Sequence, residues 1–170
     1  MKKILIISAT SATNFHLAEN IMKTIDENEK FNSEILNLEN FKLPIFNPST
    51  FKKNQKDNLE LIVSLTDRIL DSCAFVLCIP EYNGNTPPIF SNAIAWVSVT
   101  TNYWKDGFND KNVLIGSSSG GTADKLQIAL RNQMEHLGCI VFGKSIIVND
   151  NNDFKSINAK NIINEFIKVL

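Results

Sequence analysis

Residues 80–84 read PEYNG and directly follow the apolar run CAFVLCI. Gly84 lets another group approach the backbone closely, and Tyr82 can supply an aromatic wall. Such a turn can direct successive backbone N–H groups at a flat, partly polar ligand. A rigid turn without any ligand is the alternative interpretation. The candidate ligand-binding residues here are Pro80, Glu81, Tyr82, Asn83 and Gly84.

A second candidate segment, residues 8–14, reads SATSATN and comes just before a helix-period pattern. A helix N-terminus carries free N–H groups and the positive end of the helix dipole, so it can bind a phosphate. Side-chain hydroxyls can donate further hydrogen bonds. No lysine or arginine lies in this segment, so neutral dipoles would hold a bound phosphate. An ordinary cluster of N-cap residues is the alternative. The candidates are Ser8, Thr10, Ser11, Ala12, Thr13 and Asn14.

A third candidate segment, residues 116–124, reads GSSSGGTAD. Its two adjacent glycines allow a positive φ and can bring N–H groups to a ligand. Glycine- and serine-rich loops are common, so a loop without a ligand remains the alternative. The candidates in this segment are Ser117, Ser118, Gly120 and Gly121.

These three segments connect apolar runs to helix-period segments, and the two kinds of pattern alternate along the chain. The run at 3–8 is continuously apolar, as expected for a strand buried on both faces. A long loop with two prolines is expected over 39–57. We expect strands at 3–8, 33–38, 74–79, 112–118 and 145–148, and helices at 14–27, 59–69, 87–99, 126–137 and 154–170.

Alternation of strands and helices predicts an α/β protein in which helices cover both faces of a parallel sheet. Right-handed crossovers leave few strand orders. We expect the flavodoxin-like three-layer α/β/α arrangement with strand order 2-1-3-4-5, whose ligand lies at the carboxyl ends of the strands. All three candidate segments leave the sheet at that edge. The length of 170 residues suits a single domain over 1–170.

Composition argues against several classes of partner. A formal charge of −1 and a pI of about 6.1 give no electrostatic footprint for nucleic acid or an anionic membrane. No apolar run approaches the length of a membrane span, and the opening MKKILIIS is interpreted as a strand rather than a signal peptide. Cys73, Cys78 and Cys139 lie among apolar residues and are expected to be core thiols in a reducing cytoplasm.

The segment PEYNG, followed by P-x-x-x-x-N-A-I-x-W from Pro87 to Trp96, closely resembles the signature of the NADPH-dependent FMN reductase family. Residues 8–14 resemble the phosphate loop of flavodoxins and, with one residue fewer, the corresponding loop of this family. Residues 116–124 and the segment LRNQMEHLGCIVF at 130–142 also resemble family segments. The likeness therefore extends over most of the chain.

The resemblance implies bound FMN, with loop 8–14 at its phosphate and the other two loops around its flavin ring. It further implies NADPH or NADH as electron donor and a small-molecule acceptor such as a quinone, azo dye, flavin or metal oxyanion. Family members are oligomers, so a homodimer or homotetramer is expected. The flavin carries the reaction in such proteins, so no catalytic side chain is nominated.

This sequence departs from the family pattern at two places. Ser91 and Ala95 replace a lysine and an aspartate, which would pair at i, i+4 on a helix. Loop 8–14 lacks the family's glycine and arginine, which questions its affinity for FMN and its preference for NADPH. Two other functions therefore stay open: an electron carrier that holds FMN for partner proteins, and a flavin-free binding module on the same fold.

Four other residues attract attention. His16 lies in the first turn of a helix and is interpreted as an exposed residue or a phosphate contact. His136 lies near a helix end and is expected to interact with its dipole. Tyr103 and Trp104 either pack locally, line a substrate pocket or contribute to a dimer interface. The carboxylate of Glu81 either contacts a second subunit or lies near the flavin.

Overall fold

All five strands run parallel and pair in the order β2-β1-β3-β4-β5. The computed structural model describes all 170 residues. The α/β class and strand order predicted from the sequence are confirmed, and β2 is an edge strand as expected. The strands are β1 (Lys2–Ser8), β2 (Phe31–Asn37), β3 (Ala74–Cys78), β4 (Asn112–Ser118) and β5 (Ile140–Val148).

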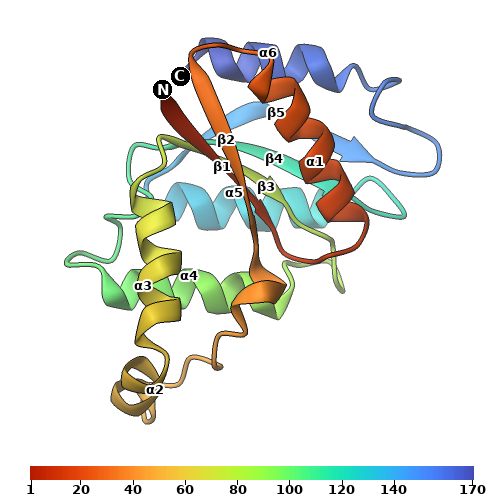
Figure 1. Ribbon diagram of the computed structural model, residues 1–170. Helices are drawn as coiled ribbons and strands as arrows, with labels where there is room; N and C mark the ends of the chain where they lie inside the picture. The colour runs from red at the N-terminus through yellow and green to blue at the C-terminus, as the bar shows by residue number, and fades with distance from the viewer.

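Helices cover both faces of the sheet, as the ribbon in Figure 1 shows. α1 and α6 pack against one face, whereas α3, α4 and α5 pack against the other. The termini lie side by side, and the Lys2 ammonium donates to the carbonyl of Leu170 at 2.9 Å. The helices are α1 (Thr13–Asp26), the 3-10 helix η1 (Leu38–Phe41), α2 (Phe51–Asp57), α3 (Leu59–Leu70), α4 (Pro88–Thr100), α5 (Asp124–His136) and α6 (Ala159–Lys168).

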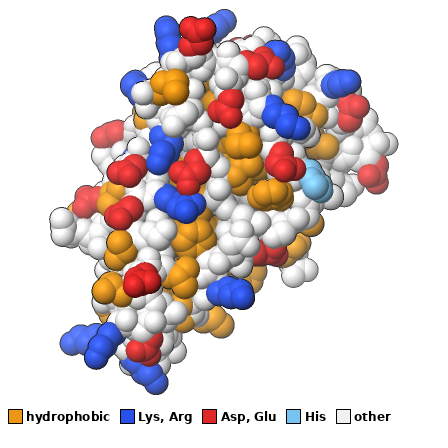
Figure 2. All heavy atoms as spheres, in the orientation of Figure 1, with side chains coloured by type: hydrophobic (Ala, Val, Ile, Leu, Met, Phe, Trp, Pro, Cys, Tyr) orange, Lys and Arg blue, Asp and Glu red, His pale blue; other side chains and the backbone are white.

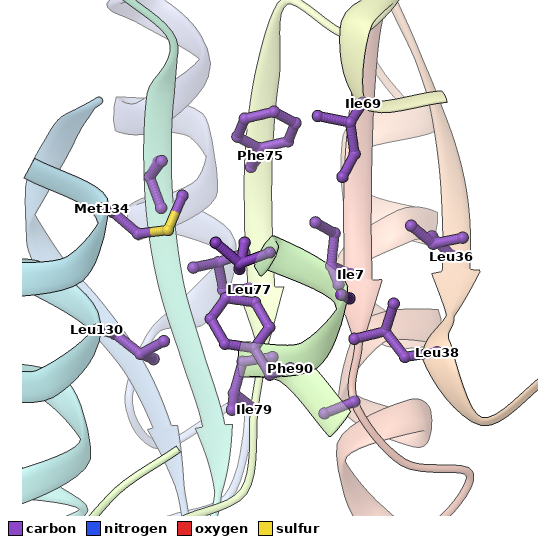
Figure 3. Close-up of a cluster of buried hydrophobic side chains, with 14 of the residues drawn as sticks. Ile7, Leu36, Leu38, Ile69, Phe75, Leu77, Ile79, Phe90, Leu130 and Met134 are labelled. Carbon is purple, nitrogen blue, oxygen red and sulfur yellow. The ribbon is translucent and has the colours of Figure 1, made fainter. Parts of the chain in front are cut away.

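Strand β1 supplies both apolar layers, because successive side chains of a strand point to opposite faces. Ile4 and Ile6 belong to the layer under α1 and α6, whereas Leu5 and Ile7 belong to the layer under α3, α4 and α5. Figure 3 shows the second layer, in which side chains from the strands meet those from the helices. This double burial explains the unbroken apolar run of the sequence.

Three element boundaries differ from the sequence-based prediction. The expected loop 39–57 contains η1 and α2, and α2 buries none of its residues, so it has no apolar stripe to reveal it. β5 begins at Ile140 rather than at 145; its first half is only partly buried, and its register against β4 shifts between Val113 and Ile115. α6 begins at Ala159 rather than at 154, and Asn158 before it has a left-handed φ of 52°.

The three thiols behave as core residues. Cys78 and Cys139 are buried, and Cys73 is partly buried. Burial raises the pKa of the Cys139 thiol to about 12, and desolvation holds the pKa of the Cys78 thiol far above its ordinary value. Neither thiol forms a nucleophilic thiolate near neutral pH.

None of the helices is long and apolar enough to span a membrane.

On the face shown in Figure 2, charged side chains are scattered, with hydrophobic side chains exposed between them. One helix, α3, exposes Leu59, Val63 and Leu70 to between 41% and 54%. Exposed apolar residues gathered on one element can mark an association surface. The expected homodimer or homotetramer stays a prediction, and this helix is where we would look for it.

Two residues of the sequence signature, Asn92 and Trp96, hold the chain between η1 and α2. The Asn92 amide accepts from the N–H of Phe46 at 2.8 Å and donates to the carbonyl of Pro44 at 3.1 Å. The fully buried Trp96 indole donates to the same carbonyl at 2.7 Å, and its ring packs on Phe46 and Phe51. These signature residues therefore stabilise the fold from a position inside α4.

Replacement of Asn92 by alanine should destabilise the protein, because it removes two hydrogen bonds and leaves the Phe46 N–H without its partner. We expect a loss of about 2 kcal/mol, which lowers the melting temperature by about 4–8 °C in a domain of this size. Differential scanning calorimetry measures this. The control Asn102→Ala, at an exposed asparagine whose side chain makes no hydrogen bond, should leave the melting temperature within a degree or so. Equal melting temperatures of the two variants would contradict the proposed anchoring.

Candidate functional site

The three candidate loops lie together at the carboxyl edge of the sheet, on the right-hand side of Figure 1. Loop 1 is defined as residues 8–14, loop 2 as residues 80–86 and loop 3 as residues 117–123. They follow β1, β3 and β4, which are adjacent strands. The parallel sheet therefore brings together the segments that the sequence analysis singled out.

Loop 1 leaves the N-terminus of α1 uncapped. The N-cap residue is Ala12, and no side chain accepts a hydrogen bond there, so the alternative of an ordinary N-cap cluster is wrong. Ser8 is buried, and its hydroxyl donates to the carbonyl of Thr10 at 2.7 Å, which braces the loop. The backbone N–H groups of Thr10, Ala12, Thr13 and Asn14 have no acceptor within the chain. These donors remain available to an anion.

Asn14 ties loop 1 to loop 3. Its side chain is 2% exposed. Its amide donates to the carbonyl of Ser118 at 2.9 Å and accepts from the N–H of Ser118 at 2.8 Å. These two hydrogen bonds engage both the nitrogen and the oxygen of the Asn14 amide. The Asn14 side chain therefore positions the two loops.

Loop 2 contains a tight two-residue turn. Tyr82 and Asn85 exchange two backbone hydrogen bonds, each of 3.0 Å. Asn83 and Gly84 between them have φ values of 52° and 73°, as a type I′ turn requires at both central residues. The N–H groups of Asn83 and Gly84 have no acceptor in the chain. The Tyr82 ring stands beside them and is 50% exposed.

Glu81 connects loop 2 to α5. One of its carboxylate oxygens accepts from the N–H of Leu126 at 3.2 Å, in the first turn of that helix. A carboxylate there is stabilised by the positive end of the helix dipole. Gly84 also faces α5, since a β-carbon added to it would lie 3.0 Å from the Lys125 side chain. The side chain thus positions α5 within its own subunit. A contact with a second subunit and a place near the flavin both stay predictions for Glu81.

Loop 3 is held by Ser117 and Ser118 and is open at its glycines. The buried Ser117 hydroxyl donates to the carbonyl of Ile79 at 2.7 Å, so it joins β4 to β3. Gly120 and Gly121 do not use the positive φ that they allow; in this loop Ala123 takes the left-handed conformation, with a φ of 52°. Nothing lies within 4 Å of a β-carbon at either glycine. The surface beside Gly120 and Gly121 is therefore not covered by other parts of the chain.

Two hollows lie beside loop 3. One, of about 330 Å³, lies between loop 2 and loop 3 and is lined by Glu81, Gly84, Ser119 and residues 121–125. The other, of about 320 Å³, is lined by Thr13 of loop 1, residues 118–120 and residues 148–150 after β5. Each has the size of a small ligand site. Together they follow the carboxyl edge from the N-terminus of α1 to the turn of loop 2.

A separate hollow of about 380 Å³ lies along α3 and the end of α4. Its lining includes Val63, Thr66 and Asn102, and none of the three loops contributes to it. The unpaired backbone donors that characterise the carboxyl edge belong to the loops. We therefore place the candidate site at the loops.

Sequence reasoning missed two residues that contact loop 1. The N–H of Ser11 donates to the carboxylate of Glu39 at 2.7 Å, and the Asn37 amide donates to the Ser11 hydroxyl at 2.8 Å. Asn37 ends β2, and Glu39 lies in η1. Since β2 is parallel to β1, its carboxyl end had to lie near loop 1, and that reasoning would have found both.

The remaining residues of interest lie elsewhere or pair locally. His16 is exposed and pairs with Glu19 at 3.0 Å. Tyr103 and Trp104 lie between α4 and β4, at the amino edge of the sheet, so within one chain they line no pocket at the loops. Trp104 packs on His136 with ring centroids 5.3 Å apart.

At the first departure from the family pattern, the Ser91 hydroxyl lies 3.2 Å from the hydroxyl of Thr86 in loop 2. Ala95, four residues later on α4, is partly buried and carries no polar group. No charge on this face of α4 is therefore left without a partner.

Comparison with known proteins assigns these features to a family. The model of the NADPH-dependent FMN reductase family matches residues 2–153, which include all three loops. No curated protein is significantly similar to the chain in sequence.

Several solved structures share the fold. The NAD(P)H:(acceptor) oxidoreductase FerB from Paracoccus denitrificans is 21% identical, with a TM-score of 0.77 over 99% of this chain and 96% of its own. An NADH:FMN oxidoreductase, EMOB, is 14% identical, with a TM-score of 0.78 over 100% of this chain and 90% of its own. An FMN-dependent NADH-azoreductase from Bacillus anthracis, solved with FMN, is 17% identical, with a TM-score of 0.69 over 97% of both chains. At these identities the likeness establishes the fold.

The pairing of Asn14 with Ser118 gives a direct test of loop positioning. Asn14→Ala should leave the Ser118 N–H and carbonyl without partners and cost about 2 kcal/mol of unfolding free energy. We expect faster amide hydrogen exchange at both loop 1 and loop 3, measured by mass spectrometry. Asn20→Ala, at an exposed position on the same helix, is the control. Faster exchange in loop 1 alone would show that Asn14 does not couple the loops.

Proposed function

The chain belongs to the NADPH-dependent FMN reductase family, and we propose that it transfers electrons from NADPH or NADH through bound FMN to a small-molecule acceptor. The acceptor class is a quinone, azo dye, free flavin or metal oxyanion. The observation that carries the proposal is a pair of groups of unpaired backbone N–H donors at the carboxyl edge. One group lies at the uncapped end of α1 and the other at the turn of loop 2, and Thr13 and Gly84 of these groups line the two hollows.

The residues present fit FMN at both groups of donors. A phosphate needs several donors at one point, and the first turn of α1 supplies free N–H groups at Ala12, Thr13 and Asn14, with the hydroxyls of Thr10 and Thr13 nearby. A flavin ring needs donors in a line beside an apolar or aromatic wall. Asn83 and Gly84 supply free N–H groups beside the exposed ring of Tyr82.

The other predicted site residues support these donors rather than meet the ligand with their side chains. Ser8 and Ser117 use their hydroxyls on backbone carbonyls. Asn14 uses its amide on Ser118, and Glu81 uses its carboxylate on α5. We propose that Pro80 ends β3 and gives the turn its start, while Gly120 and Gly121 keep the approach to the ring open.

Bound FMN would supply the redox chemistry, namely acceptance of a hydride from NAD(P)H and transfer of two electrons to the acceptor. The chain binds and orients the flavin, and its N–H dipoles stabilise negative charge on the flavin edge. No acid–base side chain is assigned, because the flavin carries the reaction in such proteins. Cys78, behind loop 2, keeps its proton, since burial raises its pKa.

Two alternatives make different predictions. An electron carrier would hold FMN and wait for a partner protein to reduce it. A flavin-free binding module would keep the fold without binding FMN. Loop 1 has no lysine or arginine, which is the one feature that favours the second alternative.

Anaerobic reduction tests the proposal directly. We expect purified protein, loaded with FMN and desalted, to show flavin absorption that bleaches when NADPH or NADH is added. The control is an equal concentration of free FMN with the same donor. Retained flavin that neither donor bleaches would indicate a carrier. No flavin bound in an equilibrium titration would indicate a flavin-free module.

Gly84→Ala tests whether the turn of loop 2 holds the flavin. Alanine at a φ of 73° costs about 1–2 kcal/mol, and its β-carbon would lie 3.0 Å from Lys125. The turn should shift, and the dissociation constant of FMN should rise about tenfold. The measurement is quenching of flavin fluorescence. Gly143→Ala is the control, because no atom lies within 4 Å of its β-carbon. Unchanged FMN affinity in Gly84→Ala would remove loop 2 from the site.

A further inference from the structure

An acidic side chain of the same chain already contacts loop 1. The carboxylate of Glu39 accepts a hydrogen bond from the backbone N–H of Ser11 at 2.7 Å. Short bonds of this kind to a charged acceptor are the stronger class of hydrogen bond. Ser11 lies one residue before the N-cap of α1, so the negative charge stands beside the free N–H groups of that helix end.

Asn37, at the junction of β2 and η1, fixes the position of Glu39. The Asn37 amide oxygen accepts from the N–H of Glu39 at 3.1 Å, while its nitrogen donates to the Ser11 hydroxyl at 2.8 Å. Asn37 itself is 8% exposed. The buried Asn37 amide thus orients both the start of η1, which carries Glu39, and the side chain of Ser11.

Nothing in the chain neutralises the Glu39 carboxylate. None of the six ion pairs includes Glu39. Loop 1 contains no lysine or arginine, and the nearby His16 pairs with Glu19. A phosphate at the end of α1 therefore meets a fixed negative charge, and one of the loop donors is already occupied.

We propose that Glu39 is a specificity-determining residue that competes with the phosphate of the flavin for loop 1. This inference rests on the proposed function. The free N–H groups of α1 favour the phosphate, and the Glu39 carboxylate opposes it through like-charge repulsion and by holding the Ser11 N–H. The chain consequently prefers FMN over riboflavin less than the free N–H groups of α1 alone would allow.

The substitution Glu39→Gln isolates the charge. A glutamine oxygen can still accept from the Ser11 N–H, so the junction of β2 and η1 keeps its hydrogen bonds while the negative charge disappears. Glu29→Gln is the matched control, because Glu29 is exposed, makes no side-chain hydrogen bond and lies between α1 and β2 at the amino edge of the sheet. Both variants change the net charge by the same amount.

Fluorescence titration of the apoprotein with FMN and with riboflavin at low ionic strength provides the test. We expect Glu39→Gln to tighten FMN binding about tenfold, which corresponds to about 1.4 kcal/mol, and to leave riboflavin binding unchanged. Glu29→Gln should change neither constant. Equal effects on the two flavins, no effect, or weaker FMN binding in Glu39→Gln would overturn the proposal.

A second measurement separates this inference from the proposed function. If neither FMN nor riboflavin binds the wild type or Glu39→Gln, the proposed function fails. The change in melting temperature on addition of inorganic phosphate then decides the role of Glu39. The melting temperature of Glu39→Gln should then rise more with phosphate than those of the wild type and Glu29→Gln. An equal rise in all three proteins would overturn the proposal.

Discussion

The parallel direction of all five strands is the constraint on which the rest of the molecule depends. It forces β1, β3 and β4 to end at one edge, so three loops meet there whatever their sequences. Their backbone groups leave the ladders at the same place, and each must find a partner or stay exposed to solvent. The side chains of the loops satisfy many of these groups: Asn14 pairs with Ser118, Ser117 with Ile79, and Glu81 with Leu126. Several backbone N–H groups of loops 1 and 2 remain unpaired within the chain, and they form the candidate site.

The contrast between paired side chains and unpaired backbone N–H groups changes how the polar residues of the loops are understood. Serine, asparagine and glutamate suggest ligand contacts when they are read in a sequence, because their side chains are good donors and acceptors. In the structure most of them are already paired within the chain and act as supports. The ligand is left to the backbone, whose donors are fixed in direction by the helix end and by the type I′ turn at Asn83 and Gly84. A site made of backbone donors needs no charge, which agrees with the neutral composition of loop 1.

The signature from Pro80 to Trp96 likewise combines two roles. Its first half forms the turn at the carboxyl edge. Its second half lies in α4, where Asn92 and Trp96 bind the carbonyl of Pro44 and hold the segment between η1 and α2. A family signature therefore records both a binding surface and the packing that keeps a neighbouring segment in place. The same neighbourhood includes the corner of β2 and η1, from which Glu39 reaches loop 1.

The sequence alone determined the periodic features. Continuous apolar runs and striped helices predicted the class and most element positions, because burial imposes those periods, and the rules for crossover connections narrowed the strand order. The turn at Asn83 and Gly84 was also predictable, because asparagine and glycine tolerate a positive φ. Features without a period were not: α2 buries nothing, and the first half of β5 is only partly buried. Only the tertiary structure decided which polar groups pair across the chain. Ser11 and Glu39 are separated by 28 residues, and Asn14 and Ser118 by 104. Such contacts depend on where parallel strands end in space, which no local pattern encodes.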